Sequence, residues 1–372
     1  MSYKICRKCV MNTSDPLITF DNDNVCNHCL DWEKSWAKKK ELEDQWPDGL
    51  LKLIKMDKFL AHSYEFDAVL GLSGGIDSSY TYHLAKELGL KIYAIHFDNG
   101  YDLPEYGENL PKLLRFWGDE LNVIKIDNEE FNRLQIAFLK SGTTGLEIPT
   151  DHAIKAITYQ TARKMGIKNI LNGTNIATES HGTRAWTEGH SDWKYIKLVA
   201  EKFGVKLHNL PHYNLLDMLT WMKNYNWISL LDYTYYDREK ATQILEKKYG
   251  YKRYGFKHQE SRITRFLHGY IIPRRFGWDT RRSRLSAMIM SGQITREEAL
   301  YTLLRPAYDP SLIEEDRRII CSQIGISDEE FEEYMNLPLK HFTDYPSYQR
   351  DMKRIRGYSI LRWAYHTFVM RR

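Results

Sequence analysis

A serine- and glycine-rich stretch carries the clearest chemical signal in the sequence. It reads Ser73-Gly74-Gly75-Ile76-Asp77-Ser78-Ser79. Two glycines let the backbone turn so that its N–H groups close around a phosphate, and serine hydroxyls add donors. The Asp77 carboxylate fits among phosphates if a bound Mg²⁺ offsets the repulsion. No lysine follows the glycines, so this is not a Walker loop. A plain glycine turn with capping serines is the structural alternative.

Four cysteines near the N-terminus have the spacing of a zinc ribbon. They form two Cys-x-x-Cys pairs separated by sixteen residues, namely Cys6, Cys9, Cys26 and Cys29. Each pair can supply two thiolates from one tight turn, and two turns complete a tetrahedral Zn²⁺ site. Disulfides are the alternative. A segment this short buries little core, so we expect a structural metal that contributes to folding, with His28 outside the ligand set.

A dense basic stretch lies in the last third of the chain. It comprises Lys257, His258, Glu260, Arg262, Arg265, Arg274, Arg275, Arg281, Arg282 and Arg284. Arginine presents a planar fork that binds phosphate in two places. One interpretation is a substrate or nucleotide-phosphate site, for which we select Lys257, His258, Glu260, Arg262, Arg265, Arg281 and Arg282. The other is a helix face in contact with solvent or with a second subunit.

The elements that position these groups alternate between strand and helix. Short apolar runs predict strands over 67–72, 91–98, 122–127 and 169–172, with helices over 76–88, 104–121 and 151–165. This alternation predicts an α/β fold: a parallel sheet with helices on both faces, which binds ligands at the carboxyl ends of its strands.

Two strand ends carry polar groups that would then face the ligand. Asp98 ends the second strand, and Gly173 and Thr174 follow the fourth, with Glu179 close behind. Asp98 is equally explained as a turn cap, and Gly173-Thr174 as a plain loop. Asp98 or Glu179 could accept a proton during catalysis, and the sequence does not choose between them.

The sequence divides into three parts. Residues 1–46 are predicted to be the zinc ribbon and a linker helix, 47–235 the α/β domain, and 236–372 a helical region for substrate or oligomer contacts. Aromatic residues between 188 and 231 predict a packed insertion. Thr295 and Ser327, each with a glutamate three residues later, predict helix starts of the capping-box form.

Composition sets broad limits. The 372 residues are 42% hydrophobic and 27% charged, with a formal net charge of +4, which indicates a globular chain. The N-terminus has no apolar core of a secretory signal, and no run is long enough to cross a membrane. We therefore expect a cytoplasmic protein.

The serine–glycine stretch resembles the pyrophosphate loop (PP-loop) of the ATP pyrophosphatases. The resemblance implies the adenine nucleotide alpha hydrolase-like fold and cleavage of ATP to AMP and pyrophosphate. It also implies that Ser73, Gly74, Gly75, Asp77, Ser78, Ser79, Asp98, Gly173 and Thr174 bind the nucleotide, with Asp77, Asp98 and Glu179 at the reacting centre.

Later blocks resemble one family within that class, the N-acetyl sugar amidotransferases of the WbpG and PseA type. They are Ser191–Ile196, Lys257–Ser261, Arg281–Ser286 and Ser291–Leu300. The resemblance implies that an acetamido oxygen of a nucleotide-linked sugar is adenylated and that ammonia displaces AMP, giving an acetamidino group. The setting would be synthesis of bacterial surface polysaccharides, such as the O-antigen of lipopolysaccharide or nonulosonic acids. ATP, Mg²⁺ and Zn²⁺ are the implied cofactors.

The resemblance also implies a separate glutaminase that supplies ammonia. The one cysteine outside the ribbon, Cys321, reads as a buried helical position, so the chain itself offers no glutaminase nucleophile. A homodimer in contact through the C-terminal third is expected. A tRNA-thiolating enzyme is the nearest alternative, but no cysteine lies near the loop. A nucleic-acid-binding module is the other, and the weak net charge argues against it.

Overall fold

A parallel five-stranded sheet lies at the centre of the chain. The computed structural model describes residues 3–61, 65–104, 107–179, 181, 183–186, 188–254 and 259–354. The strands are β1 (Ala68–Gly71), β2 (Ile92–Asp98), β3 (Leu121–Lys125), β4 (Asn169–Asn172) and β5 (Asn226–Ser229). Their order is β3-β2-β1-β4-β5, and every neighbouring pair is parallel. The predicted parallel sheet is confirmed, and β5 is an additional edge strand in the region predicted as an insertion.

Helices cover both faces of this sheet, because successive strand residues point to opposite sides. Ala68 and Leu70 pack toward one set of helices, and Val69 packs toward the other. The first set is α2 (Asp48–Ala61), α3 (Ile76–Glu87), α4 (Asn109–Trp117) and α10 (Arg238–Tyr249). The second is α6 (Ile148–Lys164) and α9 (Leu215–Asn224). α10 packs on the sheet, although its residues fall just inside the predicted C-terminal region. The predicted domain boundary at residue 235 stays a prediction.

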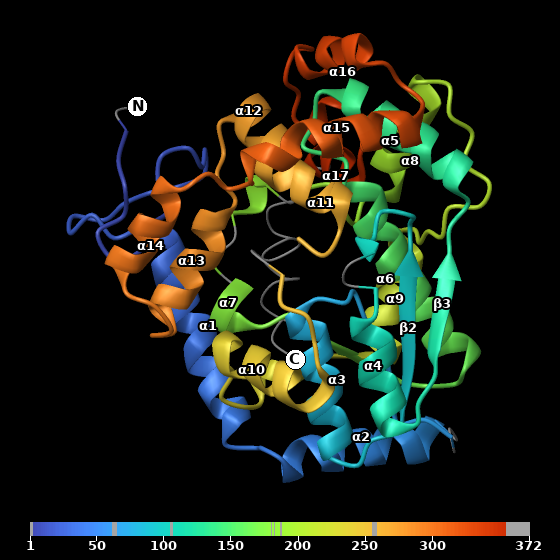
Figure 1. Ribbon diagram of the computed structural model, residues 1–372. Helices are drawn as coiled ribbons and strands as arrows, with labels where there is room; N and C mark the ends of the chain where they lie inside the picture. The colour runs from blue at the N-terminus through green and yellow to red at the C-terminus, as the bar shows by residue number, and fades with distance from the viewer. Residues whose placement is uncertain are drawn as a thin grey trace.

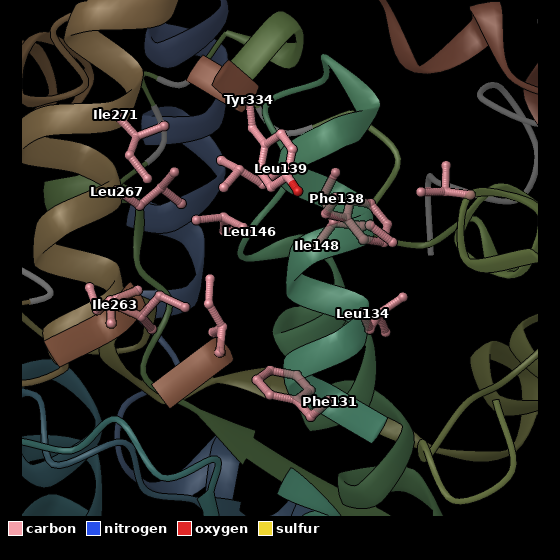
Figure 2. Packing of buried hydrophobic residues seen from close by; sticks show 14 of the residues in the cluster. Phe131, Leu134, Phe138, Leu139, Leu146, Ile148, Ile263, Leu267, Ile271 and Tyr334 are labelled. Atoms are coloured by element: carbon pink, nitrogen blue, oxygen red, sulfur yellow. The ribbon is translucent and has the colours of Figure 1, made fainter. Parts of the chain in front are cut away.

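A second apolar core joins the α/β domain to the C-terminal helices (Figure 2). Its contributors are α5 (Asn128–Ser141), α8 (Trp193–Lys202), α11 (Arg262–Phe266), the π-helical turn η4 (Leu267–Ile271), α12 (Ile272–Phe276), α15 (Pro310–Ile324) and α16 (Asp328–Met335). Phe131, Phe138 and Ile263 are fully or almost fully buried in it. The C-terminal helices are therefore fixed above the carboxyl ends of the strands.

The N-terminal segment packs against a third group of helices: α1 (Asn27–Glu43), α13 (Arg281–Met290) and α14 (Arg296–Leu304), seen together at the left of Figure 1. Val10 packs with Leu285 and Ala299, while Trp186 packs against the cysteines. Capping boxes begin α14 at Thr295 and α16 at Ser327, as predicted. The remaining described helices include α7 (Ile176–Glu179) and α17 (Tyr348–Arg354).

Candidate functional site

The glycine-rich stretch forms the predicted turn between a strand and a helix. It leaves the central strand β1 and enters α3 at Ile76, where the strand order reverses and ligand sites form in such sheets. Gly74 has a φ of 84°, a left-handed conformation that glycine adopts without strain. The Ser73 hydroxyl accepts the N–H of Gly75 at 3.2 Å, and the Ser78 hydroxyl donates to the Gly75 carbonyl at 3.1 Å. The turn is thus held by its own serines.

The turn after β4 lies directly against this one. A Cβ atom added at Gly173 would lie 2.7 Å from the Ser78 nitrogen and 2.9 Å from the Asp77 carbonyl carbon. Only glycine allows two backbones to come this close. The structure therefore brings together Gly173, Asp77 and Ser78, which the sequence analysis had selected separately.

The Asp77 side chain is almost buried and is surrounded by groups from the last third of the chain. The Tyr236 hydroxyl donates a hydrogen bond to its carboxylate. Burial, followed by the negative charge of Asp77, raises the pKa of Tyr236 well above its usual value, so this phenol remains a donor. Tyr236 was not predicted, because nothing in its local sequence marks it as a site residue.

Two arginines face the same carboxylate. Arg238, at the start of α10, is buried, and Arg284, on α13, is half-buried. Neither guanidinium donates a hydrogen bond to any residue that the structure describes, and Nη1 of Arg238 is buried without a partner there. Burial, followed by the charge of Arg238, lowers the pKa of Arg284 to about 10, so the side chain stays protonated at neutral pH. These forks are free to bind an anion.

Two tyrosines and a glutamate lie beside residues 74–76 of the turn. The Tyr254 hydroxyl accepts the N–H of Ile76 at 2.8 Å, and the Tyr251 hydroxyl donates to the Gly74 carbonyl. Glu260 Oε1 lies 3.0 Å from the position of a Cβ at Gly75. Glu260 was predicted to bind substrate or phosphate, and it does lie beside the loop. Tyr254 occupies a backbone donor at a helix N-terminus, where a phosphate oxygen would bind.

A cavity of about 410 Å³ opens beside the turn, which is large enough for a small-molecule substrate. It lies between the carboxyl ends of β1 and β2, the start of α6, and α11 with η4. Its walls include three imidazole–carboxylate pairs that the sequence analysis did not predict. They are His96–Asp102 at 2.7 Å, His190–Asp151 at 2.6 Å and His268–Glu147 at 2.9 Å. Residues from four distant parts of the chain make these pairs, so no local motif reveals them.

Several predicted nucleotide-binding or catalytic residues have other contacts. Asp98 accepts the N–H of Gly100 at 2.9 Å and caps the turn after β2. Thr174 bonds to the Asn172 side chain and to Ser229, which links the ends of β4 and β5. Ser79 is fully buried within α3, and Glu179 Oε2 accepts the N–H of Asn175 at 3.3 Å. Their roles in nucleotide binding and catalysis stay predictions.

The predicted arginines of the basic stretch stabilise helices. Arg262 and Arg265 both donate to Asp316, a fully buried carboxylate on α15. Arg281 pairs with Asp279 and bonds to carbonyls at the end of α14, and Arg282 donates to the Val10 carbonyl at 2.8 Å. Lys257 and His258 lie outside the described residues. In their described contacts these four arginines bind protein groups, while Arg284 of the same stretch is acted on by the charge of Asp77 in the loop.

The four ribbon cysteines are buried and arranged for one tetrahedral metal ion. Their Sγ atoms all lie within 4.8 Å of one another. Cys6–Cys29, Cys9–Cys26 and Cys26–Cys29 are 3.9, 3.7 and 3.7 Å apart, close to the spacing of about 3.8 Å that Zn–S bonds of about 2.3 Å require. His181 Nε2 lies 3.5 Å from Cys29 Sγ, a hydrogen bond of the kind that supports a ligand. The His28 ring pairs with Asp15 and lies outside the sulfur cluster.

Comparison with known proteins addresses the C-terminal part of the chain. Residues 260–359 match the family described as "LPS biosynthesis protein WbpG-like, C-terminal domain". The predicted likeness to the WbpG type is confirmed. This WbpG-like segment begins at Glu260, and its residues Glu260, Thr264 and His268 line the cavity beside the loop.

A solved chain described as "Structure of NMN synthetase from Francisella tularensis" is 15% identical, with a TM-score of 0.28, and the match covers 63% of this chain and 92% of that one. No curated protein matches the sequence. None of the described helices is both long and apolar enough to cross a membrane.

Proposed function

We propose that this protein is an ATP-dependent, AMP-forming amidotransferase that converts the N-acetyl group of a sugar to an acetamidino group. The proposal places it in the synthesis of bacterial surface polysaccharide. One observation carries it: the segment that matches the WbpG-like family begins at Glu260, whose carboxylate lies beside Gly75 of the serine–glycine turn. A segment whose family is named for lipopolysaccharide synthesis thus lies against a turn that would suit a nucleotide phosphate.

The residues suit an attack by an amide oxygen on the α-phosphorus of ATP. The Ser73–Ser78 turn and the N-terminus of α3 would hold phosphate oxygens, and Arg238 and Arg284 would stabilise charge on the departing pyrophosphate. Asp77 would share a Mg²⁺ ion with the phosphates, and the ion would supply further positive charge. An amide oxygen is a poor leaving group and AMP is a good one. Adenylation therefore makes the acetamido carbon reactive toward ammonia.

Two further parts of the proposal concern ammonia and zinc. Burial raises the pKa of the Cys321 thiol to about 11, so this cysteine is a poor nucleophile, and the other four cysteines lie together in the buried sulfur cluster that could hold a metal. We therefore propose a separate glutaminase as the ammonia donor. Zn²⁺ at Cys6, Cys9, Cys26 and Cys29 would cross-link the N-terminal segment and takes no part in the reaction.

The nature of the nucleotide product and the nitrogen source test this function. Purified protein is incubated with ATP, Mg²⁺, a panel of nucleotide-linked N-acetyl sugars, and either ammonium or glutamine. We expect AMP and pyrophosphate that depend on the sugar, with ammonium active and glutamine inactive. ADP as the product would contradict the PP-loop assignment, and AMP formed only with tRNA and a sulfur donor would indicate thiolation.

A further inference from the structure

The three imidazoles in the cavity differ in how their ring nitrogens are used. His96 Nδ1 donates to the Leu72 carbonyl at 2.7 Å, and its Nε2 contacts Asp102. His268 uses Nδ1 toward the Thr280 hydroxyl at 3.1 Å and Nε2 toward Glu147. Both nitrogens of these two rings are therefore occupied by protein groups.

His190 has only one nitrogen occupied. Its Nδ1 bonds to Asp151 Oδ2 at 2.6 Å, while Nε2 has no hydrogen-bond partner among the described residues. The side chain is 21% exposed and lines the cavity. A carboxylate only accepts hydrogen bonds, so Nδ1 carries the proton and the lone pair of Nε2 remains available. The His190 carbonyl accepts a bond from His152 at 2.9 Å, which helps to fix the position of the ring.

The charges around His190 favour proton uptake. Burial lowers the pKa of His190, but the bond to Asp151 and the charges of Asp151 and Glu147 outweigh burial, and the net pKa lies above the usual value. Asp151 lies in the first turn of α6 and Glu147 is the N-cap residue of that helix, whereas His268 on η4 acts in the opposite sense. The arrangement of carboxylate, imidazole and open nitrogen is that of a general base.

We propose that the Asp151–His190 pair accepts the proton of the nitrogen nucleophile in this cavity, an inference that rests on the proposed function. The lone pair of ammonia forms a C–N bond to the adenylated acetamido carbon, while the π pair of the C=N bond between that carbon and the sugar nitrogen moves onto the sugar nitrogen. One proton of the new ammonium group passes to His190 Nε2. The adduct then collapses: the C–O bond breaks, its electron pair leaves on the phosphate of AMP, and the remaining nitrogen lone pair completes the amidinium group.

The other described acids fit this role less well. Asp98 and Glu179, which the sequence suggested as the base, are absent from the described lining of the cavity and bond to backbone N–H groups. Glu260 lines the cavity but lies beside Gly75, at the phosphate end. His190 lies instead among α6 and η4 residues, in the part of the cavity that remains for the acceptor and its nucleophile.

The test separates the two halves of the reaction in His190→Asn, with His208→Asn, an exposed histidine, as the control. Sugar-dependent exchange of labelled pyrophosphate into ATP, without ammonium, reports adenylation. Amidine formation with ammonium chloride reports the second half. We expect His190→Asn to retain exchange within about twofold and to lose amidine formation by roughly 10²- to 10⁴-fold. Asp151→Asn should move the acidic limb of the pH profile to lower pH, because loss of the carboxylate lowers the pKa of His190.

The outcomes distinguish the two claims. If the unmodified protein shows no exchange with any N-acetyl sugar of the panel, the proposed function fails and this inference fails with it. If the unmodified protein is active and His190→Asn forms amidine at the normal rate, the inference alone is overturned. Equal losses in both half-reactions would also overturn it, since they would indicate a positioning role for His190.

Discussion

At the scale of single residues, Gly173 sets how closely the two strand-end turns approach. The change Gly173→Ala would place a methyl group 2.7 Å from a backbone nitrogen that cannot move aside cheaply. We expect a loss of stability of about 1–3 kcal/mol and a loss of nucleotide binding, because the turn after β1 must shift. Thermal unfolding and ATP binding would measure both.

Gly71→Ala is the matched control for stability. A Cβ there would meet the Thr158 hydroxyl at 3.8 Å, which is ordinary contact, and Gly71 also lies at a strand end on the same sheet. Equal melting temperatures for the two variants would contradict the close approach of the turns.

Arg238 carries a second prediction. The change Arg238→Lys keeps a positive charge but removes the planar fork, so we expect AMP formation to fall by about 10²-fold with little change in sugar affinity. Arg133→Ala, at a side chain that is 64% exposed, is the control. Normal turnover in Arg238→Lys would exclude Arg238 from the pyrophosphate site.

At the scale of elements, α11 and α15 are joined through a buried charge. Asp316 is fully buried and accepts bonds from Arg262, Arg265 and Tyr308. Asp316→Ala leaves two guanidiniums without their carboxylate, so we expect a loss of about 3–5 kcal/mol in the free energy of unfolding. Urea unfolding measures it, with Glu314→Ala, an exposed carboxylate on the same helix, as the control. A loss no larger than that of the control would contradict this structural role and favour the predicted phosphate-binding role of Arg262 and Arg265.

The N-terminal ribbon is held by α13 and α14, and α13 also carries Arg284. The Arg296 guanidinium donates to the carbonyls of Cys6 and Cys9 at 3.0 and 3.1 Å. Arg296→Ala should therefore destabilise the protein by about 2 kcal/mol and speed zinc loss to a chelator. Zinc release and thermal unfolding are the measurements, and Arg305→Ala, exposed at the end of α14, is the control. If Arg296→Ala released zinc at the normal rate, the inference that Arg296 holds the ribbon in place would be contradicted.

At the scale of the whole molecule, local patterns predicted the sheet and the loop. The sequence around Gly74 predicted a strand, a glycine turn and a helix, and the two Cys-x-x-Cys pairs predicted two tight turns. Each of these patterns involves residues close together in the sequence, so tertiary packing does not change it. The edge strand β5 was missed because its residues, Asn226 to Ser229, lie among aromatics that predicted an insertion. Its identity depends on pairing with β4, which no local pattern contains.

The cavity and its surroundings could not be read from local sequence. Tyr236 and Arg238 become site residues because α10 packs beside α3, which follows the turn, and His190 because it lies against Asp151 at the start of α6. In the basic stretch, Arg262 and Arg265 bind Asp316, and the charge of Asp77 acts on Arg284; a substrate- or phosphate-binding role for the stretch stays a prediction. Carboxylates far along the chain, such as Asp316, determine which arginine side chains of the stretch have an acidic partner.

The most direct test of the account is the mass of the sugar product. The protein would be incubated with ATP, Mg²⁺, each nucleotide-linked N-acetyl sugar and either ordinary or isotope-labelled ammonium, and the sugars analysed by mass spectrometry. We predict a product in which one oxygen is replaced by NH, with the label retained and AMP formed in equal amount. An unchanged sugar mass across the panel, with AMP still released, would contradict amidination.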